Sequence, residues 1–506
     1  MKKQTELKTF SSFLLILLLF LPLLYEIASL IYISLINFEH FRQAILLSIS
    51  TLNLLFTSIM ASILIALLAT VLGFFYFILL ILCENKFRDL LLILLAVPLA
   101  MGTPLYALYL LAFFGEVELL VNTFTLPTAR IPVELYGNFY YYCFVEALGL
   151  SLLSFLLLLL IFRFIGENFV KSLSLYKKRL GIKKILLILL YATRSPLLLT
   201  FLILFSFSIA DYATPHLLAI NTFQGEIFSQ ISSYNWRYAE LLSLYYLALF
   251  IPPIAIFHKV TSKFTIKPGM LERQAFLKVK SYMFTPLAFF GILGVVPYLL
   301  MINESNFLNP TFVQIIEDNG LILLKTVIVS TFAAFLMSFI AFIIYLSYEQ
   351  KFMIFLVSLA ILPKPVIGLA ILRFFSDLGI GTNYIILLYG YLLGYLPLTL
   401  LFTLALLSQF RTSFNSIHLY TPSFSNKIRI ALCFSKDKLI IFTILLTFLL
   451  LMDLNITQLL APPTFEHAFI KAVNFYHYGN HRVACTILSI LTLFKLMLLF
   501  YAFKKL

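Results

Sequence analysis

Long apolar stretches alternate with short polar segments along the whole chain. A helix needs about 20 mostly apolar residues to cross a hydrocarbon core roughly 30 Å thick. By that measure the pattern predicts an all-α polytopic membrane protein with about twelve transmembrane helices. These spans are expected near residues 11–35, 47–82, 90–114, 138–162, 185–215, 238–257, 282–302, 320–347, 353–375, 383–408, 439–460 and 483–503.

Composition excludes a soluble domain with a solvated surface, because 62% of the residues are apolar and only 11% are charged. The chain opens with MKKQTELK and an apolar run. That run is too long for a signal peptide and no small-residue cleavage site follows it, so we expect it to be retained as the first span.

Basic residues are distributed unequally between the loops. With the N-terminus in the cytosol, 27 of the 36 Lys and Arg residues fall on the cytosolic side, six on the outer side and three within spans. This bias predicts a multi-pass protein of the inner (plasma) membrane with both termini cytosolic. Topology and anionic lipid headgroups account for the net charge of +14 without a nucleic-acid partner.

Two segments repeat at an offset of 242 residues. Asp211 aligns with Asp453, and Leu217-Leu218-Ala219 aligns with Leu459-Leu460-Ala461. A basic loop precedes each copy: KSLSLYKKRLGIKK in the first and FNSIHLYTPSFSNKIRIALCFSKDK in the second. A basic linker with a Pro-Gly turn lies between them. The chain therefore divides into a first domain at 1–257 (spans 1–6), a cytosolic linker at 258–281 and a second domain at 282–506 (spans 7–12).

These repeated segments resemble the inner-membrane permeases of binding-protein-dependent ABC importers, most closely the fused two-domain permeases of ferric-iron type. ADYATPHLL and TQLLAPPTFEHAFIKAVNFYHYGNHRVA look like the corresponding iron-permease segments. In that family a cytosolic loop carries Glu-Ala-Ala, then three residues, then Gly. Placing this Gly on Gly181 puts the triplet on Leu175-Tyr176-Lys177, and the second copy aligns Asn415-Ser416-Ile417 and Thr421. Neither copy has the acidic triplet.

The resemblance implies a translocation subunit rather than an enzyme. Its implied partners are two copies of an ATP-binding ABC subunit and a soluble substrate-binding protein. No GxxxxGK[ST] motif occurs, so ATP is expected to be used by the partner ATPase, with no cofactor and no catalytic residue in this chain. The residues expected to form the ATPase-coupling loops are Leu175, Tyr176, Lys177, Gly181, Ser416, Ile417 and Thr421.

Ionisable residues within spans are candidate functional groups, because each is costly in a bilayer. Glu26 and Glu146 are better explained as structural bonds between helices, whereas the repeated Asp pair favours the translocation pathway. Lys364 lies between two prolines that break the helix, and is the expected counter-ion. The predicted pathway residues are Asp211, Thr214, Pro215, Asp453, Thr457 and Lys364. Lys325 and Lys495 lie near span ends, where we expect them to snorkel to the interface.

No resident metal site is predicted. His467, His477 and His481 share one loop, but their spacing matches no standard ligand pattern and is more typical of a solvated or partner-docking loop. The four cysteines are scattered, as expected of small core residues.

The predicted function is import of ferric iron delivered by a binding protein and driven by a separate ATPase. Thiamine, polyamine and phosphonate importers share the architecture, so the cargo stays open. An ion-coupled secondary transporter that uses Asp211 or Asp453 is the alternative from another class. A permease-like relic or scaffold is a third.

Overall fold

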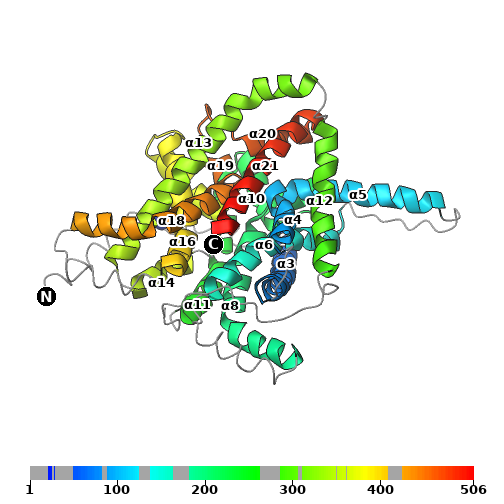
Figure 1. Ribbon diagram of the computed structural model, residues 1–506. Coiled ribbons are helices and arrows are strands. Elements are labelled where there is room, and N and C mark those ends of the chain that lie inside the picture. Colours follow the sequence, from blue (N-terminus) through cyan, green and yellow to red (C-terminus); the bar gives the residue numbers. More distant parts are fainter. Residues whose placement is uncertain are drawn as a thin grey trace.

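The computed structural model describes residues 21–25, 28, 49–82, 88–124, 137–162, 182–261, 285–305, 310–348, 350–359, 362–407 and 424–505 (Figure 1). In these parts of the chain all regular structure is helical. Eight of the described helices are long and apolar enough to cross a membrane, or nine if one sharply bent pair counts as a single span. A polytopic membrane fold is thus supported, whereas the full number of twelve spans stays a prediction.

The described helices form two series with the same order of lengths. The first series comprises α3 (Ile49–Leu82), α4 (Arg88–Met101), α5 (Thr103–Phe124), α6 (Phe139–Phe162), α8 (Ile182–Ala210), α9 (Ala213–Leu217), α10 (Phe223–Ser232) and α11 (Trp236–Thr261). After α12 (Thr285–Ser305), the second comprises α13 (Pro310–Ser347), α14 (Gln350–Ser358), α15 (Lys364–Asp377), α16 (Tyr384–Leu407), α18 (Phe424–Leu450), α19 (Asn455–Leu460), α20 (Ala468–His477) and α21 (His481–Lys505). Both series contain a long helix that stops at the repeated Asp, a very short helix, a ten-residue helix and another long helix.

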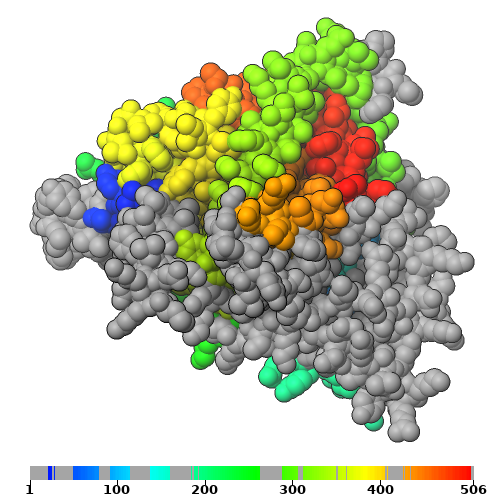
Figure 2. Space-filling view, turned by 60° about the vertical axis from the view of Figure 1, so that its left-hand side comes forward, coloured from blue at the N-terminus to red at the C-terminus, as the bar shows by residue number. Residues whose placement is uncertain are grey.

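Each series packs in the same way. Helix α3 contacts α6 and α8, and α13 makes the matching contacts with α16 and α18. The short helices α9 and α19 rest on α5 and α15 respectively. On one face of the molecule α13, α18 and α21 lie side by side (Figure 2).

The two series also exchange helices. Helix α21 packs on α4 of the first series, and α11 packs on α14 and α15 of the second. Helix α12, which precedes the second series, packs against α4 and α5. At the N-terminal end Tyr25 reaches α15 in the same manner, because its ring packs edge-on against Phe374. The series therefore interlock instead of forming two separate bundles.

Two predicted spans are broken in the middle. The span expected at 90–114 bends by 106° between α4 and α5, at Gly102 with φ +89°. The span expected at 353–375 is interrupted before Lys364, where Pro363 supplies the extended residue at the start of α15. Proline cannot donate a backbone hydrogen bond and clashes with the preceding turn, so the sequence itself dictates this second break. The span expected at 439–460 starts earlier, at Phe424, and ends at Leu450.

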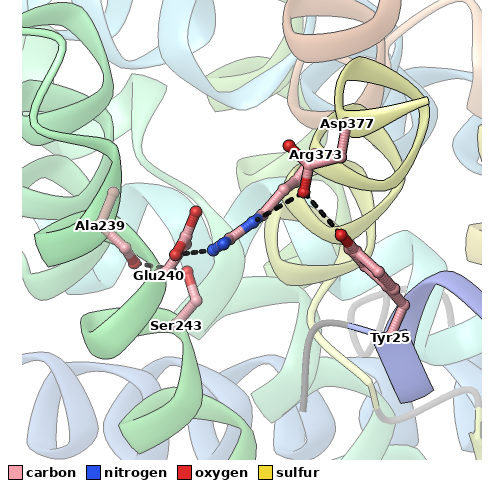
Figure 3. A network of polar contacts seen from close by, with 6 residues as sticks. All are labelled: Tyr25, Ala239, Glu240, Ser243, Arg373 and Asp377. Carbon is pink, nitrogen blue, oxygen red and sulfur yellow. Dashed lines mark hydrogen bonds and ion pairs between the residues drawn. The ribbon is translucent and has the colours of Figure 1, made fainter. Parts of the chain in front are cut away.

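A buried ion pair joins the two series at one end of α11 (Figure 3). The Arg373 guanidinium on α15 pairs with the Glu240 carboxylate on α11, and its Nε lies 3.5 Å from Asp377 Oδ2. The Tyr25 hydroxyl donates to the same Asp377 oxygen at 2.8 Å. Three segments that are far apart in sequence are thus joined, because Arg373 links α15 to α11 and Asp377 links α15 to Tyr25. We call this network the α11–α15 clamp.

A related network lies between α5, α12 and α21. The Tyr109 hydroxyl donates to the Glu304 carboxylate and also contacts the Cys485 thiol, which is 3.6 Å from the same carboxylate. Cys485 follows Glu240 by 245 residues, which matches the offset between α11 and α21. Both exchanges of helices are therefore fastened by polar groups.

We predict that Gly102→Ala destabilises the protein more than Gly137→Ala. Both glycines have positive φ, a conformation that costs a non-glycine residue about 1–3 kcal/mol. At Gly102 an added Cβ would also lie 2.5 Å from the buried Phe469 ring, whereas at Gly137 nothing lies within 4 Å. Thermal unfolding of the purified variants in detergent measures the difference. Equal losses at the two positions would contradict the close approach of Phe469 to the α4–α5 bend.

We also predict strong energetic coupling across the clamp. Arg373→Met alone strands the buried Glu240 carboxylate, a loss of about 3–5 kcal/mol for a buried charge without its partner. Glu240→Leu together with Arg373→Met removes both charges, so the double variant should regain most of that stability. A double-mutant cycle on unfolding in detergent gives the coupling free energy. Additive effects of the two substitutions would show that the pair does not hold the series together.

Candidate functional site

Four helix breaks meet around one internal cavity. The breaks are those between α4 and α5, α8 and α9, α14 and α15, and α18 and α19. The cavity has a volume of about 110 Å³. Its lining residues are Leu99, Gly102, Thr103, Pro104, Glu146, Leu150, Leu153, Phe207, Asp211, Lys364, Tyr395, Leu449, Met452, Asp453, Leu454, Asn455 and Phe469. Both series thus contribute to the wall, and we call this space the central cavity.

Both carboxylate oxygens of Asp453 accept hydrogen bonds at the α18–α19 break. Its Oδ2 accepts the backbone N–H groups of Ile456 and Thr457, at 3.1 and 3.0 Å, and the Thr457 hydroxyl at 3.0 Å. Its Oδ1 accepts the Tyr395 hydroxyl at 2.8 Å. An Asp at this place satisfies the free N–H groups that open α19. Asp453 therefore serves as a helix cap and an anchor for α16.

Asp211 has the matching place at the α8–α9 break, but only one of its carboxylate oxygens accepts a hydrogen bond there. Its Oδ1 accepts the Ala213 N–H at 3.1 Å, but its Oδ2 is buried without a hydrogen-bond partner. The neighbouring Glu146 on α6 is 2% exposed, and its Oε2 also lacks a partner. Both side chains face the central cavity and each other. Two carboxyl oxygens are thus left available at the first break, whereas none is left at the second.

Lys364 brings a positive charge to the opposite wall. Its Nζ lies 4.0 Å from the centroid of the Phe207 ring and 3.8 Å from that of Tyr395, so the ammonium is held between two aromatic faces. Phe207 belongs to α8 and Tyr395 to α16, hence the lysine bridges the two series. Lys364 is the first residue of α15, so its ammonium lies near the positive end of the helix dipole, where a positive charge is unfavourable. The cavity, with three acids and one lysine, has a formal charge of −2 if all are ionised.

Three of the predicted pathway residues line the central cavity: Asp211, Asp453 and Lys364. The other three are buried in α9 and α19 and do not line it. Of these, the Thr214 hydroxyl donates to Thr103 Oγ1 at 3.1 Å, and Thr457 bonds to Tyr391. Pro215 packs inside α9. The predicted coupling residues, Leu175, Tyr176, Lys177, Gly181, Ser416, Ile417 and Thr421, lie outside the described residues, as does Glu26.

Sequence reasoning missed two kinds of group. Tyr391 and Tyr395 contact the α19 break, and their spacing of four on one helical face was a signal that could have found them. Glu240 and Arg373, which no sequence motif singles out, form the buried clamp. Only packing could reveal that pair, because the two residues come from different halves of the sequence.

A second, larger cavity of about 600 Å³ lies between α9 and α10 of the first series and α20 of the second. Its lining combines apolar side chains with polar ones, among them Glu226, Asn221, Gln458 and Asn474. The His216 and His477 rings, one from each series, are 6.2 Å apart in its wall. It shares no lining residue with the central cavity.

Comparison with known proteins gives no relative. No protein-family model matches the chain, and neither the curated proteins nor the solved structures contain a significant match. The functional argument therefore depends on the residues and their geometry.

The three loop histidines are separated by the fold. His467 is buried with both ring nitrogens unpartnered, His477 is exposed at the second cavity, and His481 packs against Tyr476. Among the described residues no group of three or more His, Cys, Asp or Glu side chains is placed to hold a metal ion.

The expectation that Lys495 snorkels to the membrane interface is wrong. Its side chain is 0% exposed, and its Nζ lies 5.2 Å from the Phe469 ring centroid. Lys325, in contrast, is exposed.

We predict that stability falls at acidic pH because of His467, which lies between α19 and α20 outside the candidate spans. Burial, reinforced by the Lys495 ammonium, lowers the pKa of His467 from 6.5 to about 3. Between these values the unfolded chain binds a proton that the native imidazole does not, so unfolding becomes easier as pH falls below 6.5, by up to about 1.4 kcal/mol per pH unit. Thermal unfolding in detergent at pH 7.5 and 5.0 measures the effect.

The matched variants for this experiment are His467→Gln and His477→Gln. The first removes the titrating group and should flatten the dependence on pH. The second changes an exposed histidine of the same segment and should leave the dependence as it is. An unaltered pH profile in His467→Gln would assign the acid sensitivity to other groups.

Proposed function

We propose that this chain is the membrane-spanning subunit of an ABC importer, with two helical halves around one pathway, a separate pair of ATPase subunits and a soluble binding protein. The observation that carries the proposal is the repeated series of helices, whose broken members enclose a single cavity between them. Irregular backbone at membrane depth is tolerated where it lines a cavity or is buried in protein. Its repetition in both series favours a translocation pathway over a structural accident.

A mechanical connection supports the coupling step. Helices α8 and α18 begin at Ile182 and Phe424, within the two basic segments that resemble ATPase-coupling loops and after the expected coupling residues. They end just before Asp211 and Asp453, which line the central cavity. They contain 29 and 27 residues. At 1.5 Å per residue each spans about 40 Å. A continuous helix of this length would transmit a displacement of its loop to the cavity wall, which is the motion that alternating access requires.

The chemistry of the cavity supports a cationic cargo, with ferric iron as the favoured one. Its charged and polar lining consists of carboxylates, a phenol, an amide, a hydroxyl and one lysine, without imidazole or thiol. Hard cations prefer oxygen ligands of these kinds. Alternating access would be driven by closure of the ATPase pair, which would pull on the two loops and open the pathway outward to accept cargo released by the binding protein.

An ion-coupled secondary transporter is the second candidate, and the unpartnered carboxyl oxygens of Glu146 and Asp211 favour it. Buried carboxylates of this kind also serve as coupling-ion sites. The two candidates differ in their energy source, since only the importer needs an ATPase.

We predict that the chain co-purifies with an ABC ATPase of its own cell and supports ATP-driven uptake in reconstituted vesicles. Gly181→Val should weaken cargo-stimulated ATP hydrolysis, because a β-branched residue is costly if the expected turn at this position has positive φ. Thr421→Val should have a milder effect, since that position already carries a side chain.

Membrane insertion and thermal stability of the two variants serve as controls. A wild-type chain that binds no ATPase and transports only under an ion gradient would replace the importer by the secondary transporter. Absence of transport under both conditions would favour the relic or scaffold.

A further inference from the structure

The two walls of the central cavity differ in the charged groups that they present. The repeat places an Asp at both the α8–α9 and the α18–α19 breaks, yet the hydrogen bonds of the two acids differ. Asp453 uses both oxygens on α19 and Tyr395, whereas Asp211 keeps Oδ2 without a partner. The second wall also carries Lys364. Any cation that enters therefore meets available carboxyl oxygens on the first wall and a fixed ammonium on the second.

Glu146 completes the first wall. Its side chain is almost wholly buried, its Oε2 has no hydrogen-bond partner, and its carboxyl group lies beside the side chains of Asp211, Thr214 and Thr103. An ionised carboxylate in this environment is costly unless it has a positively charged partner. Lys364 cannot be that partner in this conformation, because its Nζ is held between the Phe207 and Tyr395 rings.

The size of the cavity restricts the class of ligand. The cavity of about 110 Å³ is somewhat smaller than the ~150 Å³ apolar cavity that takes up one benzene molecule. It has room for a metal ion with part of its hydration shell, but not for an organic cation much larger than benzene.

We propose that Glu146 and Asp211 form the cation-binding site of the pathway, that the ligand is a single hard metal cation bound through oxygen, and that Lys364 is a tethered ammonium that weakens this binding. The assignment deepens the proposed function and depends on it for the direction of transport. Asp453, although it is the repeat equivalent of Asp211, is a positioning residue that fixes α19 and Tyr395. The ammonium of Lys364 repels a cation at the pair, which keeps binding weak enough for release.

The test is direct cation binding to the purified full-length chain in detergent, without ATPase or binding protein. Terbium(III), a hard cation whose luminescence is sensitised by nearby tyrosine, is the probe. Glu146→Gln and Asp211→Asn should each lower its affinity at least tenfold, since each removes a charged ligand at constant shape. Lys364→Met should raise the affinity, a change of opposite sign that damage to the fold would not produce.

Two further variants act as references. Asp318→Asn, which removes an exposed acid on α13, should leave terbium binding unchanged. Asp453→Asn should lower the thermal stability more than it lowers the affinity. Ferric citrate should displace the probe, whereas thiamine and spermidine should not.

The proposal is overturned if Glu146→Gln and Asp211→Asn bind terbium like the wild type, if Asp453→Asn loses as much affinity as Asp211→Asn, or if Lys364→Met weakens binding. Displacement by an organic cation and not by iron would overturn the ligand class. Because no ATPase is present, these outcomes are independent of the importer. A chain that binds terbium as expected but holds no ATPase retains the cation site and loses the proposed function.

Discussion

The need to satisfy backbone polar groups in apolar surroundings controls this structure. Four helices stop in the interior, and each break frees N–H and C=O groups that cannot reach bulk water. Each break has a residue suited to it: Gly102 adopts the left-handed conformation at the first, Pro363 precedes α15, and an Asp accepts backbone hydrogen bonds at the other two. Because the breaks converge, their freed groups and the polar residues that serve them share one cavity. The candidate site is thus a consequence of how the helices end.

The same requirement explains why the repeated acids differ. At the α18–α19 break the cap is complete, and Tyr395 adds a fourth hydrogen bond to Asp453. At the α8–α9 break the cap is partial, with Glu146 beside it. Asp211 and Asp453 have matching places in the two series of helices, but neighbouring residues on α6 and α16 give them different contacts. Lys364, held by one ring from each series, marks the boundary between the two walls.

Polar contacts also determine how the series interlock. The α11–α15 clamp and the Tyr109–Glu304–Cys485 network each fasten a helix of one series to the other. In a membrane the apolar surfaces of helices gain little by association, because lipid tails are as apolar as leucine side chains. Buried ion pairs and hydrogen bonds therefore provide the register that hydrophobic packing alone does not. The exchange of α11 and α21 places both series around the cavity and not beside each other.

The sequence by itself determined the helical membrane class, the approximate positions of most of the long helices that the structure describes and the offset between the two similar segments, because apolar length acts locally along the chain. It also indicated the break at Lys364, since proline excludes helix wherever it occurs in a span. It could not decide which of the acids stays available, because Asp211 and Asp453 have the same place in the repeat and differ only through partners on other helices. The clamp, the aromatic cage of Lys364 and the separation of the three histidines likewise arise from contacts between segments more than 100 residues apart in several cases. Tertiary structure alone decided these features, since hydrogen-bond satisfaction and burial depend on the neighbours that folding brings into contact.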